Sequence, residues 1–222
     1  MNIVIINGSP KPLGGNSAIL VEQLRKQLDN QPMEQYYTVL DIKNSPVSEN
    51  DYILFETADV LIFAFPLYCD GLPSHLLKQL TILDEWFNSR KGSKSSARGR
   101  LTVYALANCG FYDGHNTALA LRMVRSWCLR CGLIWGQGMG IGGGELLSNM
   151  PKTRFGHGVL KSAGKKMEFF ASNIAAIKKG EDIFSSPDMP RLFYVNGANH
   201  YMWERKARQN NLTKKQMLYR IP

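Results

Sequence analysis

The chain has 222 residues, of which 44% are hydrophobic and 20% are charged, and its net charge is +9. This length suits one α/β domain with additions and is short for two domains. No apolar run approaches the ~20 residues of a membrane helix, and the apolar segment after Met1 breaks at Asn7-Gly8 before any cleavage-site pattern. We therefore expect a soluble, cytoplasmic protein, and the four cysteines do not resemble a secreted disulfide framework.

The first stretch of the chain predicts a buried strand, a polar loop and an amphipathic helix. The strand is the β-branched run at residues 3–6, and the chain turns at Asn7-Gly8. The helix shows apolar residues at helical spacing, namely Leu20, Val21, Leu24 and Leu28. A loop that enters a helix N-terminus offers unpaired N–H groups and a positive dipole end, so it suits a phosphate. Further groups suited to an anion are the side chains of Ser9, Asn16 and Ser17 and the cation of Lys11.

The same loop has a plainer interpretation, in which Asn16 or Ser17 only caps the helix. Two known phosphate loops are excluded by spacing. The loop lacks the Gly-Lys-Ser/Thr ending of a nucleoside-triphosphate loop, and its glycines at 8, 14 and 15 do not form the dinucleotide pattern G-x-G-x-x-G. A mononucleotide phosphate is therefore the best match.

The rest of the chain predicts strands alternating with helices. Further strands are expected at residues 36–40, 59–65, 101–107 and 133–137. Further helices are expected at residues 51–57, 73–87, 115–131 and 160–180. Residues 138–144, rich in glycine, are expected to be a flexible segment suited to close approach of a ligand. Right-handed crossovers then give a doubly wound parallel sheet, with the loops after strands one, three, four and five converging at its carboxyl edge.

Basic charge is concentrated in two segments. Residues 90–100 carry five basic and no acidic residues, and residues 191–222 carry seven basic residues against the single acid Glu204. Such patches solvate a surface, attract anionic cofactors or bind nucleic acid, but no nucleic-acid-binding motif accompanies them, so nucleic acid is not the expected partner. We expect a domain over residues 1–190 and a basic, aromatic tail over residues 191–222, the one segment whose composition suggests disorder.

Three motifs in order resemble the flavodoxin-like NAD(P)H-dependent FMN reductases. They are Ile6-Asn-Gly-Ser-Pro-Lys11 followed by Asn16-Ser17, then Pro66-Leu-Tyr-Cys-Asp-Gly-Leu-Pro73, then Asn108-Cys-Gly-Phe111. The resemblance covers about residues 1–145, and the tail around residues 199–212 is similar to members of this group from anaerobic bacteria. It implies a five-stranded parallel sheet of order 2-1-3-4-5 with helices on both faces and a C-terminal extension.

The resemblance also implies an FMN site. Its phosphate would lie on Ser9, Lys11, Asn16 and Ser17. Its ring would lie between Pro66, Leu67, Tyr68 and Cys69 on one side and Asn108, Cys109, Gly110 and Phe111 on the other. Tyr68 and Phe111 would stack on the ring, or they are hydrophobic plugs at the sheet edge. Backbone N–H groups of residues 108–111 are candidates to stabilise negative charge on the reduced ring.

The implied activity is hydride transfer from NADH or NADPH through FMN to a small acceptor such as a quinone, a nitroaromatic, a flavin or a metal centre. No catalytic side chain is expected, because the flavin carries the chemistry. The resemblance favours a homodimer in which both chains border the cofactor. Residues 191–222 would then cross to the second subunit at the dimer interface, or they wrap their own domain. The alternatives are a flavodoxin-type electron carrier, although such carriers are usually acidic and shorter, and a non-catalytic interaction protein of the same shape.

The cysteines and histidines do not predict a metal site. Residues 41–51 contain no cysteine, so the iron-sulfur cluster of one branch of this group is not expected. Cys69 and Cys109 are interpreted as small apolar filler rather than redox thiols, and the pair Cys128 and Cys131 as core packing. The histidines at 75, 115, 157 and 200 show no ligand spacing. Lys11 stands where many relatives have arginine, which keeps the charge but loses bidentate geometry.

Overall fold

A computed structural model describes residues 1–11, 15–43, 46–90, 97, 99–150 and 153–217. The chain divides into two compact units, Met1–Pro187 and Asp188–Pro222. No described helix is long and apolar enough to cross a membrane. That the first unit is a flavin-binding domain and the second a tail at a dimer interface stays a prediction.

The first unit is built on a parallel sheet of six strands in the order β2-β1-β3-β4-β5-β6. The strands are β1 (Asn2–Asn7), β2 (Tyr36–Asp41), β3 (Val60–Pro66), β4 (Thr102–Asn108), β5 (Ile134–Ile141) and β6 (Ile183–Ser185). The doubly wound fold and the order of the first five strands are as expected, but the prediction of five strands was wrong. The sixth strand has three residues between charged and hydroxyl-rich segments, too short to show a periodic pattern.

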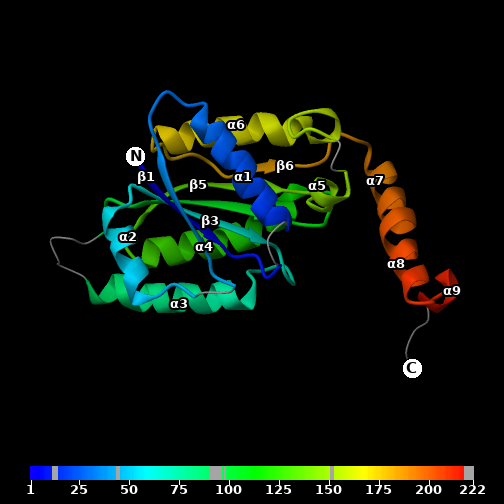
Figure 1. Ribbon diagram of the computed structural model, residues 1–222, viewed down its shortest axis with the longest axis horizontal. Coiled ribbons are helices and arrows are strands. Elements are labelled where there is room, and N and C mark those ends of the chain that lie inside the picture. Colours follow the sequence, from blue (N-terminus) through cyan, green and yellow to red (C-terminus); the bar gives the residue numbers. More distant parts are fainter. Residues whose placement is uncertain (12–14, 44–45, 91–96, 98, 151–152, 218–222) are drawn as a thin grey trace. The chain divides into compact units, whose positions relative to one another are not determined.

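Helices cover both faces of this sheet (Figure 1). They are α1 (Asn16–Asp29), α2 (Tyr52–Thr57), α3 (Ser74–Ser89), α4 (Ala118–Arg130), α5 (Glu145–Asn149) and α6 (Lys161–Ala175), with short 3₁₀ turns η1 (Glu49–Asp51), η2 (Gly114–Thr117) and η3 (Gly158–Leu160). Side chains of α1 and α6 form one core with one face of the sheet, and side chains of α2, α3 and α4 form a second core on the other face. Burial on both faces explains why the central strands are continuously apolar.

Strand β5 runs to Ile141, so the interpretation of residues 138–141 as a flexible segment was wrong. The glycines serve close packing instead. A Cβ on Gly136 would lie 2.5 Å from Cζ of Tyr104, a fully buried ring on the neighbouring strand β4. Glycine in this strand therefore marks crowding by neighbours rather than flexibility.

Two helix limits also differ from the sequence prediction. Residues 114–117 form a 3₁₀ turn before α4, and α6 ends at Ala175 rather than near Gly180. The chain leaves α6 through Ile177, whose φ is +50°, and Lys178 N–H donates to Asn173 O over 2.8 Å. This is a Schellman-type ending with isoleucine at the position where glycine is usual, which explains why the sequence pattern gave no stop there.

The second unit is helical over most of its described length. It contains α7 (Arg191–Gly197), a π-helical turn η4 (Ala198–Trp203), α8 (Glu204–Gln209) and α9 (Lys214–Met217). The expectation of disorder here was wrong for residues 191–217. Glu204, the single acid of residues 191–222, accepts from Lys214 Nζ at 2.9 Å and from His200 Nδ1 at 3.2 Å, which lowers the pKa of its carboxyl. The Glu204 carboxylate thus binds basic side chains from two elements of this unit, η4 and α9.

Candidate functional site

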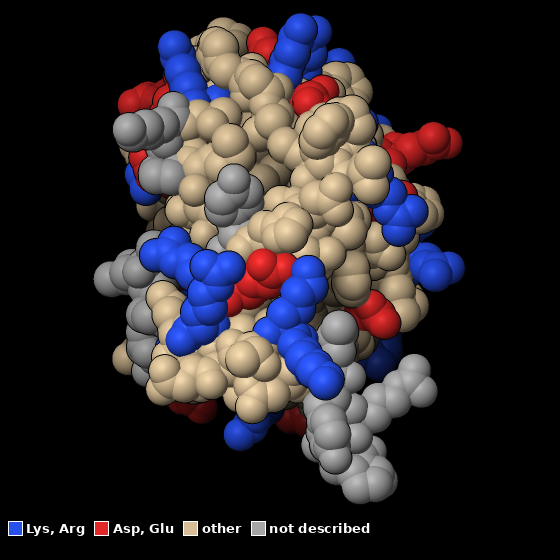
Figure 2. All heavy atoms as spheres, turned by 90° about the vertical axis from the view of Figure 1, so that its right-hand side faces the viewer, with Lys and Arg blue, Asp and Glu red and all other residues tan. Residues whose placement is uncertain are grey.

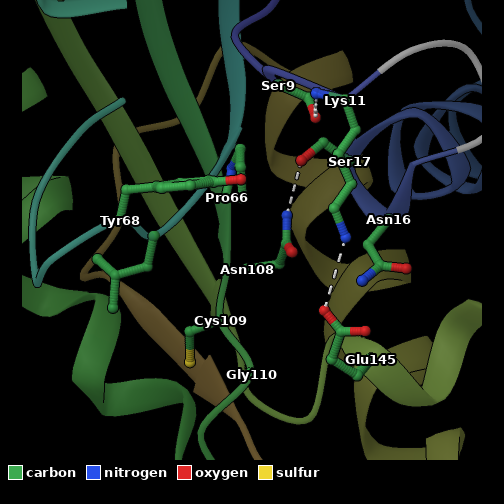
Figure 3. Close-up of a pocket in the computed structure, with 11 residues that line it drawn as sticks. Ser9, Lys11, Asn16, Ser17, Pro66, Tyr68, Asn108, Cys109, Gly110 and Glu145 are labelled. Atoms are coloured by element: carbon green, nitrogen blue, oxygen red, sulfur yellow. Dashed lines mark hydrogen bonds and ion pairs between the residues drawn. The ribbon is translucent and has the colours of Figure 1, made fainter. Parts of the chain in front are cut away.

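A hollow of about 120 Å³ lies at the carboxyl edge of the sheet, where β1, β3 and β4 end (Figure 3). Its lining residues are Ser9, Lys11, Asn16, Ser17, Pro66, Leu67, Tyr68, Asn108, Cys109, Gly110 and Glu145. All predicted site residues except Cys69 and Phe111 are in this set. The sequence prediction did not include Glu145. Parallel strands in this order bring these three loops to one edge, as a doubly wound sheet requires.

The first loop is shaped by its own polar side chains. Ser9 N–H donates to Asn7 Oδ1 over 3.2 Å, and Lys11 N–H donates to Ser9 Oγ over 3.3 Å. Ser9 is buried and Lys11 is exposed. Asx- and Ser-type turns of this kind fix a loop without regular secondary structure. The loop therefore presents the Ser9 hydroxyl to the hollow from a fixed backbone.

Helix α1 begins at the hollow without a side-chain cap. Gly15 is the N-cap residue, no described side chain caps the first turn, and the first turn contains no acidic residue. The interpretation of Asn16 or Ser17 as a mere cap was therefore wrong. Asn16 is 8% exposed, and its buried Oδ1 has no hydrogen-bond partner among the described residues. N–H groups without a described side-chain cap and a positive dipole end make this helix end suited to an anion.

Ser17 connects the first loop to the loop after β4. Asn108 Nδ2 donates to Ser17 Oγ over 2.8 Å and to Phe65 O over 3.2 Å. The Leu67 N–H donates to Asn108 O over 2.7 Å, which ties the loop after β3 to the same residue. Asn108 is buried, so these hydrogen bonds hold the three loops in a defined arrangement.

The loop after β3 makes a tight turn. Tyr68 and Gly71 exchange backbone hydrogen bonds of 3.0 and 2.9 Å, and the two residues between them, Cys69 and Asp70, have φ angles of +45° and +59°. Two positive φ values in succession are typical of a type I′ turn, usually made by Asn-Gly. The turn places Tyr68 at the hollow and Cys69 outside it.

The two predicted stacking residues differ in position. Tyr68 lines the hollow and is 44% exposed, whereas Phe111 is 54% exposed and lies outside the lining set. Neither ring is a buried plug at the sheet edge, so that alternative was wrong. Stacking of either ring on a ligand stays a prediction.

The backbone N–H group and the thiol of Cys109 both contact other parts of the protein. Its N–H donates to Ile141 O over 2.9 Å, so the expectation that this N–H faces the reduced ring was wrong. Its Sγ lies 3.8 Å from Phe111 O and 3.7 Å from Asp113 O. Burial raises the pKa of the Cys109 thiol to about 11. The thiol is therefore neutral near pH 8, as expected for filler.

Thiol-specific alkylation should distinguish the four cysteines. Cys69 is exposed, so its interpretation as apolar filler was wrong, while the other three are buried. With iodoacetamide at pH 8, we expect one label on the native protein, at Cys69, and none on the Cys69→Ser variant. Peptide mass spectrometry measures this, with urea-unfolded protein labelled four times as the reference. Fast native labelling at Cys109 would contradict the buried position of this thiol.

The CxxC pair is part of the core, as predicted. Cys128 and Cys131 are fully buried, and burial raises the pKa of both thiols, that of Cys128 to about 12. Cys131 Sγ contacts Asp84 Oδ1 at 3.3 Å. Among the described residues, no group of three or more His, Cys, Asp or Glu side chains is arranged to hold a metal ion.

The two basic segments were interpreted as patches. In the first, residues 91–96 and 98 lie outside the described residues, while Arg90 pairs with Glu56 and stacks on Trp86 at 4.9 Å. Arg100 donates to Ala58 O over 2.6 Å. These two arginines therefore fix the segment before β3. On the face shown in Figure 2, lysine and arginine side chains gather around a small group of acidic ones.

Sheet order, helical layers and the position of the hollow define a flavodoxin-like α/β protein. Residues 1–104 match the family model described as a flavodoxin-like fold. A comparison of the sequence with curated proteins finds no significant match. The flavodoxin-like fold that the three motifs indicated is thus confirmed.

Solved structures with the same fold include several oxidoreductases. The chain is similar to an NADH:FMN oxidoreductase in its apo form, with 16% identity, 81% of this chain and 91% of that chain covered, and a TM-score of 0.58. An NADPH-quinone reductase from P. pentosaceus shows 14% identity, coverage of 79% and 98%, and a TM-score of 0.55. An FMN-dependent NADH-azoreductase from Bacillus anthracis in complex with FMN shows 13% identity, coverage of 79% and 100%, and a TM-score of 0.54. At these identities the likeness shows the fold.

Proposed function

We propose that this chain is an FMN-dependent oxidoreductase that passes hydride from NADH or NADPH through bound FMN to a small acceptor. The observation that carries the proposal is the hollow at the carboxyl edge of the sheet. There the N-terminus of α1 lies beside the loops that follow the neighbouring strands β3 and β4. The solved structures that share the fold of this chain include enzymes whose names mention FMN, NADH or NADPH. The fold alone does not define an activity, so the site must support the proposal.

The residues present suit the phosphate of FMN. Ser9 and Ser17 supply hydroxyl donors, the first turn of α1 supplies N–H groups, and Lys11 supplies a positive charge. The amide of Asn16, buried and without a partner at Oδ1, can turn its NH₂ group toward an anion. A phosphate would thus accept from the first-turn N–H groups and, once the amide has turned, from Asn16 Nδ2.

The same hollow is too small to enclose a whole mononucleotide. Its volume of about 120 Å³ lies below the roughly 300–1,000 Å³ typical of ligand pockets. The residues that would hold the ring are Leu67, Tyr68, Asn108 and Gly110, and Tyr68 is 44% exposed. Because a hollow of this volume would not enclose the ring, a second substrate could reach the ring from solvent.

When bound, FMN would supply the redox chemistry, accepting hydride from a reduced nicotinamide and returning electrons to an acceptor. The chain's own contribution is position and electrostatics. Asn108 holds the three loops together, Leu67 and Tyr68 offer an apolar wall, and the neutral thiol of Cys109 takes no part in proton transfer at neutral pH. The acceptor class, a quinone, a nitroaromatic, a flavin or a metal centre, is part of the proposal.

We also propose that the chain forms a homodimer in which residues 191–222 contribute to the interface. The second unit exposes Leu192, Phe193 and Trp203, which are 68%, 68% and 58% exposed. Apolar and aromatic side chains exposed in this density are typical of a protein interface. A molar mass of about 50 kDa in light scattering, twice the 25.0 kDa of one chain, would support it.

The test of the proposed function is the visible absorption spectrum of the purified protein, repeated after anaerobic addition of NADH or NADPH. We expect an oxidised-flavin spectrum, from the start or after incubation with FMN, that bleaches with one of the two nucleotides. Flavin without bleaching would favour an electron carrier instead. No flavin, even in excess FMN, would leave the first loop without a phosphate and favour a non-catalytic interaction protein.

A further inference from the structure

The hollow contains one pair of opposite charges. Among the described residues that line it, only Lys11 and Glu145 are charged, and Lys11 Nζ lies 3.9 Å from Glu145 Oε1. Figure 3 shows the two side chains extended toward each other, Lys11 from the first loop and Glu145 from the start of α5. The cation expected to bind a phosphate is therefore already paired with a carboxylate.

Glu145 is held in place by the loop after β4. Gly144 N–H donates to Cys109 O over 2.8 Å, and Asn149 Nδ2 donates to Glu145 O over 2.8 Å. The Glu145 side chain passes over Gly110, because a Cβ on Gly110 would lie 3.8 Å from Glu145 Cγ. The Glu145 side chain thus lies beside Gly110, expected to hold the ring, and reaches Lys11, expected to hold the phosphate.

The Lys11–Glu145 ion pair is accessible to water, and another anion can easily replace Glu145 as the partner of Lys11. The side chains of Lys11 and Glu145 are 56% and 32% exposed, and exposed pairs attract each other weakly. A phosphate dianion carries more charge than a carboxylate and would take over Lys11. The Glu145 carboxylate would then face the dianion inside one hollow, and like charges at such distances repel.

We infer that Glu145 is a specificity-determining residue, which competes with the ligand's phosphate for Lys11 and so weakens binding of FMN relative to unphosphorylated flavin. The inference rests on the proposed function, because it concerns the charge of the flavin at the same site. It assigns a role to a residue outside the three sequence motifs.

The test compares FMN with riboflavin, which lacks the phosphate. We expect Glu145→Gln, which keeps the shape and removes the charge, to lower the Kd for FMN about fivefold in low salt, as for removing one like charge near a partly exposed dianion. The Kd for riboflavin should change less than twofold. In 0.5 M salt the gain for FMN should shrink, because screening shortens the range of the repulsion. Flavin fluorescence titration of the wild type and of Glu145→Gln measures each of these Kd values.

The matched control is Glu85→Gln on α3, which removes the same charge from an exposed position outside the hollow. It should leave both Kd values unchanged. If Glu145→Gln weakens the binding of FMN and of riboflavin equally, Glu145 binds a part of the flavin that both ligands share, and the inference is wrong. An unchanged Kd for FMN also overturns it. If the wild-type protein binds neither flavin, the proposed function itself is wrong, and the inference is lost with it.

Discussion

Replacing Ser9 and Ser17 together with alanine should raise the Kd for FMN about 100-fold. Both hydroxyls line the hollow beside the uncapped end of α1, and both residues are buried. A hydrogen bond to a charged group is worth about 1.5–3 kcal/mol, so two lost bonds to a phosphate remove about 3 kcal/mol, or two factors of ten. Fluorescence titration with FMN and with riboflavin measures the change.

Riboflavin separates loss of the phosphate site from damage to the protein. Ser17 Oγ also accepts from Asn108, so removing it disturbs the loop after β4. We therefore expect the Kd for riboflavin to rise by no more than about fivefold, which corresponds to the loss of one neutral hydrogen bond. Ser126→Ala, an exposed serine on α4, should change neither Kd. If FMN binds the double variant as tightly as the wild type, the first loop does not hold the phosphate.

The site could be predicted largely from local sequence because its residues lie in short loops directly after strands. Once the strand order is right, the carboxyl ends of β1, β3 and β4 meet at one edge, and Ser9, Pro66 and Asn108 come together without any further information. Continuous apolar runs identified those strands, since burial on both faces leaves no room for polar residues.

Glu145 was missed because its position depends on contacts far from it in the sequence. It follows a glycine-rich segment with no helical or strand period, and its backbone is placed by the hydrogen bond from Gly144 N–H to Cys109 O. The different positions of Tyr68 and Phe111 also have no local signal. Which ring faces the hollow is decided by the tight turn at Cys69 and Asp70, where φ is positive without any glycine.

Replacing Gly140 with alanine should lower the free energy of unfolding by about 3 kcal/mol. A Cβ at this position would lie 2.1 Å from Thr117 Oγ1, 2.7 Å from Phe184 Cδ1 and 2.9 Å from Gly114 O. Thr117 is fully buried, and its Oγ1 donates to Gly114 O over 2.8 Å. Neither Thr117 nor Gly114 can therefore move away from the added methyl group without moving η2. Overpacking of this kind typically costs about 1–3 kcal/mol. A loss of about 3 kcal/mol should lower Tm by about 6–12 °C in a protein of this size.

Thermal unfolding followed by circular dichroism measures the effect of Gly140→Ala, and two variants show where it arises. Gly71→Ala is the control, because a Cβ there would meet no atom nearer than 3.8 Å, and its Tm should stay close to the wild-type value. Adding Thr117→Ala to Gly140→Ala removes the closest contact, so the double variant should lose less stability than the sum of the two single changes. If Gly140→Ala has the wild-type Tm, β5 does not pack against η2 as closely as described. Close packing would then not explain why β5 has glycine where a strand normally has valine or isoleucine.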